Sequence, residues 1–111
     1  MYQIINEQSI YQYFGEDDPE MTREMIQIIL DTNIKDLKEL DKFYEQKDFA
    51  TIKKRCHKAK PTMSYIGALK SRKLLEEIEA NLESSENLNK SLQGHLNLII
   101  EELNDFLISL K

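Results

Sequence analysis

The chain has 111 residues, of which 41% are hydrophobic and 32% charged, and its formal net charge is −5. This composition fits a single soluble domain over residues 1–111 and is too apolar for a disordered chain. The acidic balance argues against general nucleic-acid binding, because phosphate neutralisation needs a basic face. Three glycines and two prolines are too few for many short strands, so we expect a few long helices.

The first predicted helix covers residues 6–14, and residues 15–18 form a break. Asp18-Pro19-Glu20 is a strong helix start, with an N-cap acid, proline at the first position and an acid in the first turn. We expect a second helix over residues 19–46. Its seam has 4-3-4-3-4 spacing and comprises Ile26, Leu30, Asn33, Leu37, Leu40 and Tyr44. Asn33 could fix the register or lie at the edge of the seam, and we favour the edge.

Asp48 is the predicted N-cap of a third helix, and Gly67 ends that helix. Its seam comprises Phe49, Ile52, Cys56, Ala59, Met63 and Ile66. A fourth helix carries Ser71, Leu75, Ile78 and Leu82, and residues 84–87 form a loop. The last helix carries Leu88, Leu92, Leu96, Ile99, Leu103, Phe106 and Leu110. These stripes are buried most simply in an all-α, antiparallel four-helix bundle, with the short first helix as an extra element that caps one end.

The sequence favours a cytoplasmic protein. Cys56 is the only cysteine, so no intrachain disulfide can form, and a reducing compartment is the simplest interpretation. The N-terminal MYQIINEQSI lacks the basic and apolar regions of a signal peptide. No apolar run approaches the roughly 18–20 residues of a membrane span, so we expect no membrane association.

One face of the third helix carries a histidine among small and cationic side chains. At 100° per residue, His57 lies roughly 130° from the centre of the seam, so it is predicted to be exposed. Lys53, Lys60, Pro61 and Ser64 fall within about 60° of His57. A free imidazole titrates near 6.5 and is therefore mostly neutral and nucleophilic at pH 7. If it carried a phosphoryl group, Lys60 could offset the negative charge.

The stretch HKAKPTMSYIGA, residues 57–68, resembles the signature of histidine-containing phosphotransfer (HPt) domains. That signature is His-x-x-Lys-Gly followed at a fixed distance by an apolar residue, Gly and Ala, and the spacing here matches without a gap. Lys47-Asp48-Phe49 also resembles the usual entry to the active helix of that family. The overall length and helix order are similar too, so the resemblance covers nearly the whole chain.

The resemblance implies a phosphorelay carrier, and no stand-alone enzyme, in two-component signalling. His57 would accept a phosphoryl group from a receiver-domain aspartate or a histidine kinase and pass it to a response-regulator aspartate, with Lys60 stabilising the charge. The docking surface would include Lys53, Pro61, Ser64, Gly67 and Ala68. The partners would be a receiver domain and a hybrid histidine kinase, and the carrier is expected to be a monomer. It would have no cofactor of its own, since Mg²⁺ belongs to the receiver.

One position departs from the family pattern. Pro61 stands where the family usually has glycine, which is thought to leave room for the receiver. Proline lacks an N–H, so the His57 carbonyl loses its usual helical partner, and a local kink is expected.

Two other reactive side chains have structural interpretations. His95 flanks the last seam, where packing or simple exposure is expected, and two histidines without nearby paired acids make a weak metal site. Cys56 lies in the seam as a small buried hydrophobe. Lys53, Lys54, Arg55 and Lys58 could be a solvated face or could steer an acidic receiver surface.

Two other functions remain open from the sequence. The chain could be a helical adaptor without chemistry, although the presence of both His57 and Lys60 speaks against that. It could also be the substrate domain of a chemotaxis-type histidine kinase. The initial Met and the lack of a trailing linker favour a free-standing module.

Overall fold

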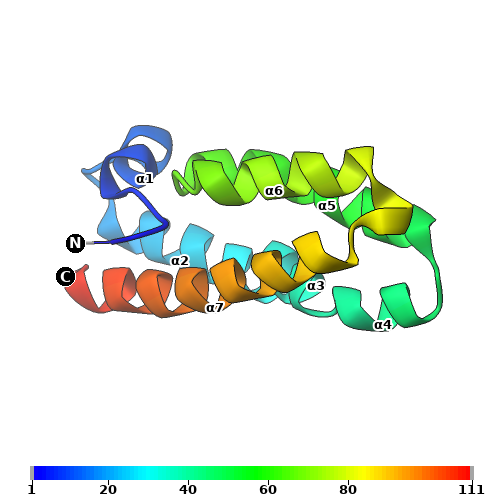
Figure 1. The fold of residues 1–111 in the computed structure, drawn as a ribbon. Coiled ribbons are helices and arrows are strands. Elements are labelled where there is room, and N and C mark those ends of the chain that lie inside the picture. Colours follow the sequence, from blue (N-terminus) through cyan, green and yellow to red (C-terminus); the bar gives the residue numbers. More distant parts are fainter. Residues whose placement is uncertain (1, 111) are drawn as a thin grey trace.

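The protein is a helical bundle in the computed structural model, which describes residues 2–110 (Figure 1). No strand occurs among these residues, as the sequence predicts. The bundle measures 44 × 21 × 19 Å. The elements in chain order are α1 (Glu7–Phe14), α2 (Pro19–Ile29), the π-helical η1 (Leu30–Ile34), α3 (Lys35–Lys38), α4 (Leu40–Glu45), α5 (Phe49–Tyr65), α6 (Leu69–Ala80), the 3₁₀ turn η2 (Leu82–Ser84) and α7 (Glu86–Ser109).

Helices α5 and α6 lie side by side in one layer, and α7 runs along α2 and α3 in the other (Figure 1). Helix α1 lies at one end of the bundle, as predicted, and both termini lie at the same end (Figure 1). The third- and last-helix seams are confirmed: Cys56, Met63, Leu96 and Phe106 are all fully buried. No helix within residues 2–110 is long and apolar enough to cross a membrane.

The prediction of a single helix over residues 19–46 is wrong, because the backbone changes from α-helical to π-helical geometry at η1. Ile29 and Ile34 both lie in the core although they are five residues apart. Regular α-helical spacing of three or four residues cannot place both on one face, whereas an i→i+5 π turn can. Leu30, which the predicted seam placed inward, is consequently half-buried, and Asn33 is half-buried at the edge of the seam, as favoured from the sequence.

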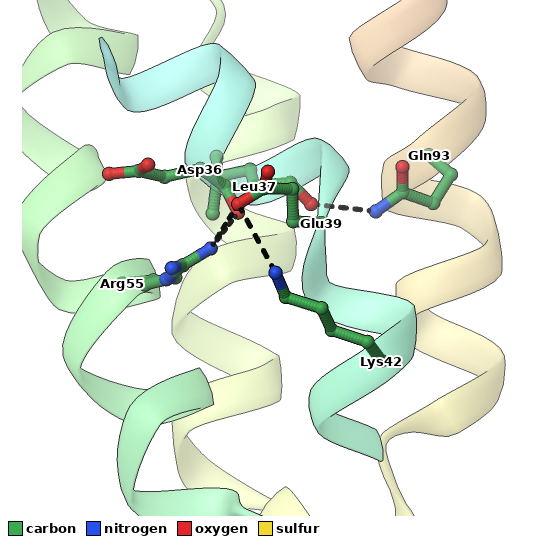
Figure 2. A network of polar contacts seen from close by, with 6 residues as sticks. All are labelled: Asp36, Leu37, Glu39, Lys42, Arg55 and Gln93. Carbon is green, nitrogen blue, oxygen red and sulfur yellow. Dashed lines mark hydrogen bonds and ion pairs between the residues drawn. The ribbon is translucent and has the colours of Figure 1, made fainter. Parts of the chain in front are cut away.

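A second interruption occurs at Glu39, between α3 and α4. Side chains from α5 and α7 donate hydrogen bonds to the backbone and side chains there (Figure 2). The Arg55 guanidinium donates to the Asp36 carbonyl at 2.8 Å and to the Glu39 carboxylate at 3.1 Å. The Gln93 amide donates to the Leu37 carbonyl at 2.9 Å. These donors add hydrogen bonds to carbonyls at a helix end, where the regular α-helical donors are missing.

The predicted loop over residues 84–87 is shorter in the structure, because α7 already begins at Glu86. At the other end of α7, the buried Glu102 carboxylate accepts hydrogen bonds from the backbone N–H groups of Gln3, Ile4 and Ile5 at 2.8–3.0 Å. This contact fastens the segment before α1 to the bundle.

Candidate functional site

Helix α5 carries the predicted site and is held firmly from its first residue. The Asp48 carboxylate caps it by accepting from the Thr51 backbone N–H at 3.2 Å and from the Thr51 hydroxyl at 2.7 Å. Cys56 and Ala59 flank the histidine and are buried in the core. His57 therefore projects outward, and its side chain is 76% exposed, in agreement with the prediction.

A carboxylate from the neighbouring helix lies beside the histidine. Glu79 of α6 has one oxygen, Oε1, at 3.7 Å from His57 Nδ1. The side chain is only 15% exposed, and Oε1 is buried without a hydrogen-bond partner in the described part of the chain. Because the exposed imidazole can rotate about its side-chain bonds, an Nδ1–H group could reach this oxygen without movement of the helix.

The other oxygen of Glu79 holds Lys60. Its Oε2 lies 3.2 Å from Lys60 Nζ. The Lys60 side chain is only 18% exposed, so its predicted place in an exposed strip is wrong. The ammonium lies between α5 and α6 because it pairs with this carboxylate. Imidazole, carboxylate and ammonium thus form a connected row across the two helices.

The remaining strip residues differ in accessibility. Lys53 and Pro61 are exposed, as predicted. Ser64 is half-buried, since the Arg72 guanidinium of α6 donates a hydrogen bond to its hydroxyl. Ser64 is therefore hydrogen-bonded to α6, and a partner protein could contact only the exposed part of its side chain.

Gly67 and Ala68 lie in the turn between α5 and α6, where Gly67 is half-buried. Gly67 has a φ of +74°, and a Cβ there would lie 2.5 Å from Asn6 Cβ, so glycine is needed where α1 crosses the α5–α6 turn. Ala68 is fully buried. The prediction that Ala68 lies on the docking surface is therefore wrong, because its methyl group is enclosed in the core and cannot contact a partner.

Helix α5 continues through Pro61 to Tyr65. The missing N–H costs one helical hydrogen bond, and the expected local kink stays a prediction. The next residue is anchored on the inner side of the helix, where the Thr62 hydroxyl donates to Asn33 Oδ1 at 2.7 Å. The π-helical segment η1 thus supports α5 behind the proline.

Cys56 and His95 have the structural roles that the sequence indicates. Burial, reinforced by the Glu79 charge, raises the pKa of the Cys56 thiol to about 12, so the reactive thiolate is scarce near neutral pH. His95 Nδ1 lies 2.8 Å from the Ser71 hydroxyl between α6 and α7. Burial lowers the His95 pKa, and the Lys70 charge adds to this effect. No group of three or more His, Cys, Asp or Glu in residues 2–110 could hold a metal ion.

Sequence reasoning missed Glu79 and Arg72, the two side chains of α6 that complete the site. A usable signal exists, because a tight turn at Gly67 places the start of α6 beside the end of α5. The positive charge of Lys60 on α5 is then complementary to the acidic stretch EEIE, residues 76–79, on α6. Residue types alone did not indicate which acid lies opposite.

The row brings an imidazole, a carboxylate and an ammonium group together on neighbouring helices. An exposed imidazole provides a nucleophilic nitrogen, a carboxylate faces its second nitrogen, and an ammonium group lies one helical turn away. No family model matches the chain, and neither does any curated protein or solved structure. The geometry of this row is therefore the structural basis for assigning a function.

Proposed function

We propose that the protein is a phosphorelay carrier in which His57 accepts and returns a phosphoryl group. The observation that carries the proposal is the row His57–Glu79–Lys60, which puts a carboxylate and an ammonium beside an exposed imidazole. The resemblance of residues 57–68 to HPt domains supports the same function. The donor would be an aspartyl phosphate of a receiver domain or a histidine kinase, and the acceptor a response-regulator aspartate.

The proposed step uses each member of the row. With Nδ1 protonated and facing Glu79, the lone pair of His57 Nε2 attacks phosphorus, and an N–P bond forms as the O–P bond to the donor aspartate breaks. The aspartate carboxylate leaves with the electron pair. The ring then carries positive charge next to Glu79, and the phosphoryl oxygens carry negative charge within reach of Lys60. Mg²⁺ would be held by the receiver and would neutralise the transferring group.

The proposal includes the finer architecture and setting that the sequence suggests. The segments α2, η1, α3 and α4 would act as one interrupted helix, which with α5, α6 and α7 makes an antiparallel four-helix bundle with α1 as the extra helix. The carrier would work as a cytoplasmic monomer. It would need no cofactor of its own, and its partners would be a receiver domain and a hybrid histidine kinase.

The test is direct labelling. The protein is incubated with receiver domains loaded by radiolabelled acetyl phosphate, and the bound phosphate is tested for the acid lability and base stability of phosphohistidine. His57→Gln should fold normally and take no label, while His95→Gln should label like the wild type. Full labelling of His57→Gln would overturn the assignment. Labelling by a kinase and ATP, with no transfer to or from any receiver, would indicate a kinase substrate domain instead.

Lys60→Ala refines the test. Loss of the ammonium should slow transfer by about 5–30-fold, or 1–2 kcal/mol in the barrier, because one charge-assisted contact to the phosphoryl group disappears. The protein should also be less stable, since Glu79 loses its partner. An unchanged single-turnover rate would remove Lys60 from the site.

A further inference from the structure

Positive charge is concentrated in one part of the chain. Residues 49–75 contain eight of the fifteen Lys and Arg residues and none of the twenty Asp and Glu residues. The other 84 residues carry seven basic and twenty acidic side chains, a net charge of −13. Helix α5 and the first half of α6 therefore form a basic region on an otherwise acidic protein.

Some of these cations are used inside the bundle. Arg55 binds the Glu39 carboxylate, Lys60 binds Glu79, and Arg72 binds the Ser64 hydroxyl. These contacts stabilise the fold, and Lys60 already has its proposed role at the transferred phosphoryl group. These three of the eight cations therefore need no role in docking the partner protein.

Three others remain available around the histidine. Lys53, Lys54 and Lys58 are exposed, and none forms an ion pair within residues 2–110. At 100° per residue they project within about 100° of His57, and the farthest lies about 6 Å away along the helix axis. We call these three residues the lysine face. Three like charges therefore lie beside one exposed imidazole.

We propose that the lysine face docks a carboxylate-rich protein surface, namely the surface that surrounds the aspartyl phosphate of the partner receiver. This inference rests on the proposed function and adds the electrostatic character of the partner. The face would attract the partner before contact and orient it so that its phosphoryl group approaches His57. The donor group is itself anionic, so the same field favours its arrival.

The other anionic partners fit the molecule less well. An extended polyanion such as DNA would meet the repulsion of the remaining −13 charge within a few Debye lengths. A membrane-surface helix needs apolar side chains on its bound face. Tyr65 is the large exposed apolar side chain of α5 in the described chain, and it packs at a tilt against Tyr13 of α1 with ring centroids 4.9 Å apart. A compact acidic patch on a partner protein requires neither an extended binding surface nor the insertion of apolar side chains.

The experiment compares two double charge reversals with the same net charge. Lys54→Glu/Lys58→Glu removes two members of the lysine face. Lys35→Glu/Lys90→Glu reverses two exposed lysines on α3 and α7. Second-order transfer rates are measured against receiver domains loaded with acetyl phosphate, from low salt to about 1 M NaCl, where screening is nearly complete.

At low salt, the Lys54→Glu/Lys58→Glu variant should transfer at least about tenfold more slowly than the wild type and show a flatter salt dependence. The rate at saturating receiver should stay within about twofold of wild type, because the variant keeps His57, Glu79 and Lys60. The Lys35→Glu/Lys90→Glu variant should behave like the wild type at every salt concentration. Equal low-salt rates and equal salt slopes for all three proteins would overturn the proposed docking role of the lysine face. They would leave the proposed phosphotransfer by His57 intact.

A binding measurement separates this inference from the proposed function. An oligoglutamate peptide, phosphatidylglycerol vesicles and a short DNA duplex are each titrated at low salt and followed by amide NMR shifts. Peptide-induced shifts centred on α5, absent in Lys54→Glu/Lys58→Glu, support the lysine face even if no receiver labels His57. Preferential binding of vesicles or DNA, or no peptide shifts on α5, overturns it.

Discussion

Glu79→Gln is the most informative single change, because it removes one negative charge and preserves the size of the side chain. In the wild type, Oε1 lies 3.7 Å from His57 Nδ1 and Oε2 lies 3.2 Å from Lys60 Nζ. The substitution should therefore affect two neighbours in different ways. The imidazole loses the carboxylate that we propose orients its Nδ1–H group, and the ammonium loses its counter-ion.

The magnitudes follow from the geometry. Two unit charges about 4 Å apart interact by about 1 kcal/mol in water and about 4 kcal/mol near a protein surface. The imidazole is 76% exposed, which favours the lower figure, so phosphotransfer should slow about fivefold. Lys60 is mostly covered, so the loss of its partner should cost about 1–2 kcal/mol of stability. For a chain of this length, the melting temperature should fall by roughly 4–8 °C.

Three measurements test this reasoning on the same samples. Nitrogen NMR of the His57 ring reports the tautomer, single-turnover labelling reports the transfer rate, and a thermal melt reports stability. Glu76→Gln is the matched control, since it neutralises an exposed acid one turn earlier on α6. The control should keep the wild-type tautomer and rate.

A fall in melting temperature alone would refute the functional part of the argument. If Glu79→Gln keeps the wild-type tautomer ratio and single-turnover rate, Glu79 serves only to hold Lys60 in place. A tautomer change without a rate change would show that Nδ1 protonation does not limit transfer.

Three further changes test other parts of the site. Pro61→Gly should keep or raise the melting temperature, because it restores a helical N–H. It should nevertheless slow transfer from a receiver, because we expect the proline to orient His57 toward its partner. Equal or faster transfer would exclude a docking role for Pro61. Gly67→Ala should destabilise the protein by about 2 kcal/mol or more in urea unfolding, because φ is +74° and a Cβ would collide with α1; a wild-type midpoint would contradict this. The His95 pKa is lowered in the folded state, so the unfolded chain binds more protons as the pH falls through about 6.5. Wild type should then lose more stability than His95→Gln between about pH 7.5 and 5.5, and parallel urea-unfolding curves for the two proteins would exclude this linkage.

The sequence predicts those parts of the fold whose cause is local. Asp18 and Asp48 cap their helices as expected, and Gly67 ends α5 in a left-handed conformation that favours glycine. The seam of α5 is buried with the predicted register, and that register is what turns His57 outward. Capping, turn chemistry and hydrophobic periodicity act over a few residues, so they can be recognised in the chain itself.

The parts that could not be predicted depend on distant groups. The turn at Glu39 is held by Arg55 of α5 and Gln93 of α7, and neither is near it in sequence. The burial of Lys60 depends on which α6 acid lies opposite it. Periodicity places Lys60 near the solvent side of α5, but only the packing of two helices places the Glu79 carboxylate within 3.2 Å of its ammonium.

The candidate site joins a fixed backbone to an accessible side chain. Cys56 and Ala59 are locked in the core on either side of His57, and Thr62 is bonded to the π-helical segment. The imidazole itself remains 76% exposed. A carrier must present the same nitrogen to two different partners, so its reactive group has to be reachable from outside while its position stays constant. A more deeply buried histidine would lose the first property, and a histidine on a mobile loop would lose the second. The position of His57 on α5 satisfies both requirements of the proposed function, and the nearby Glu79 carboxylate is placed to orient the ring.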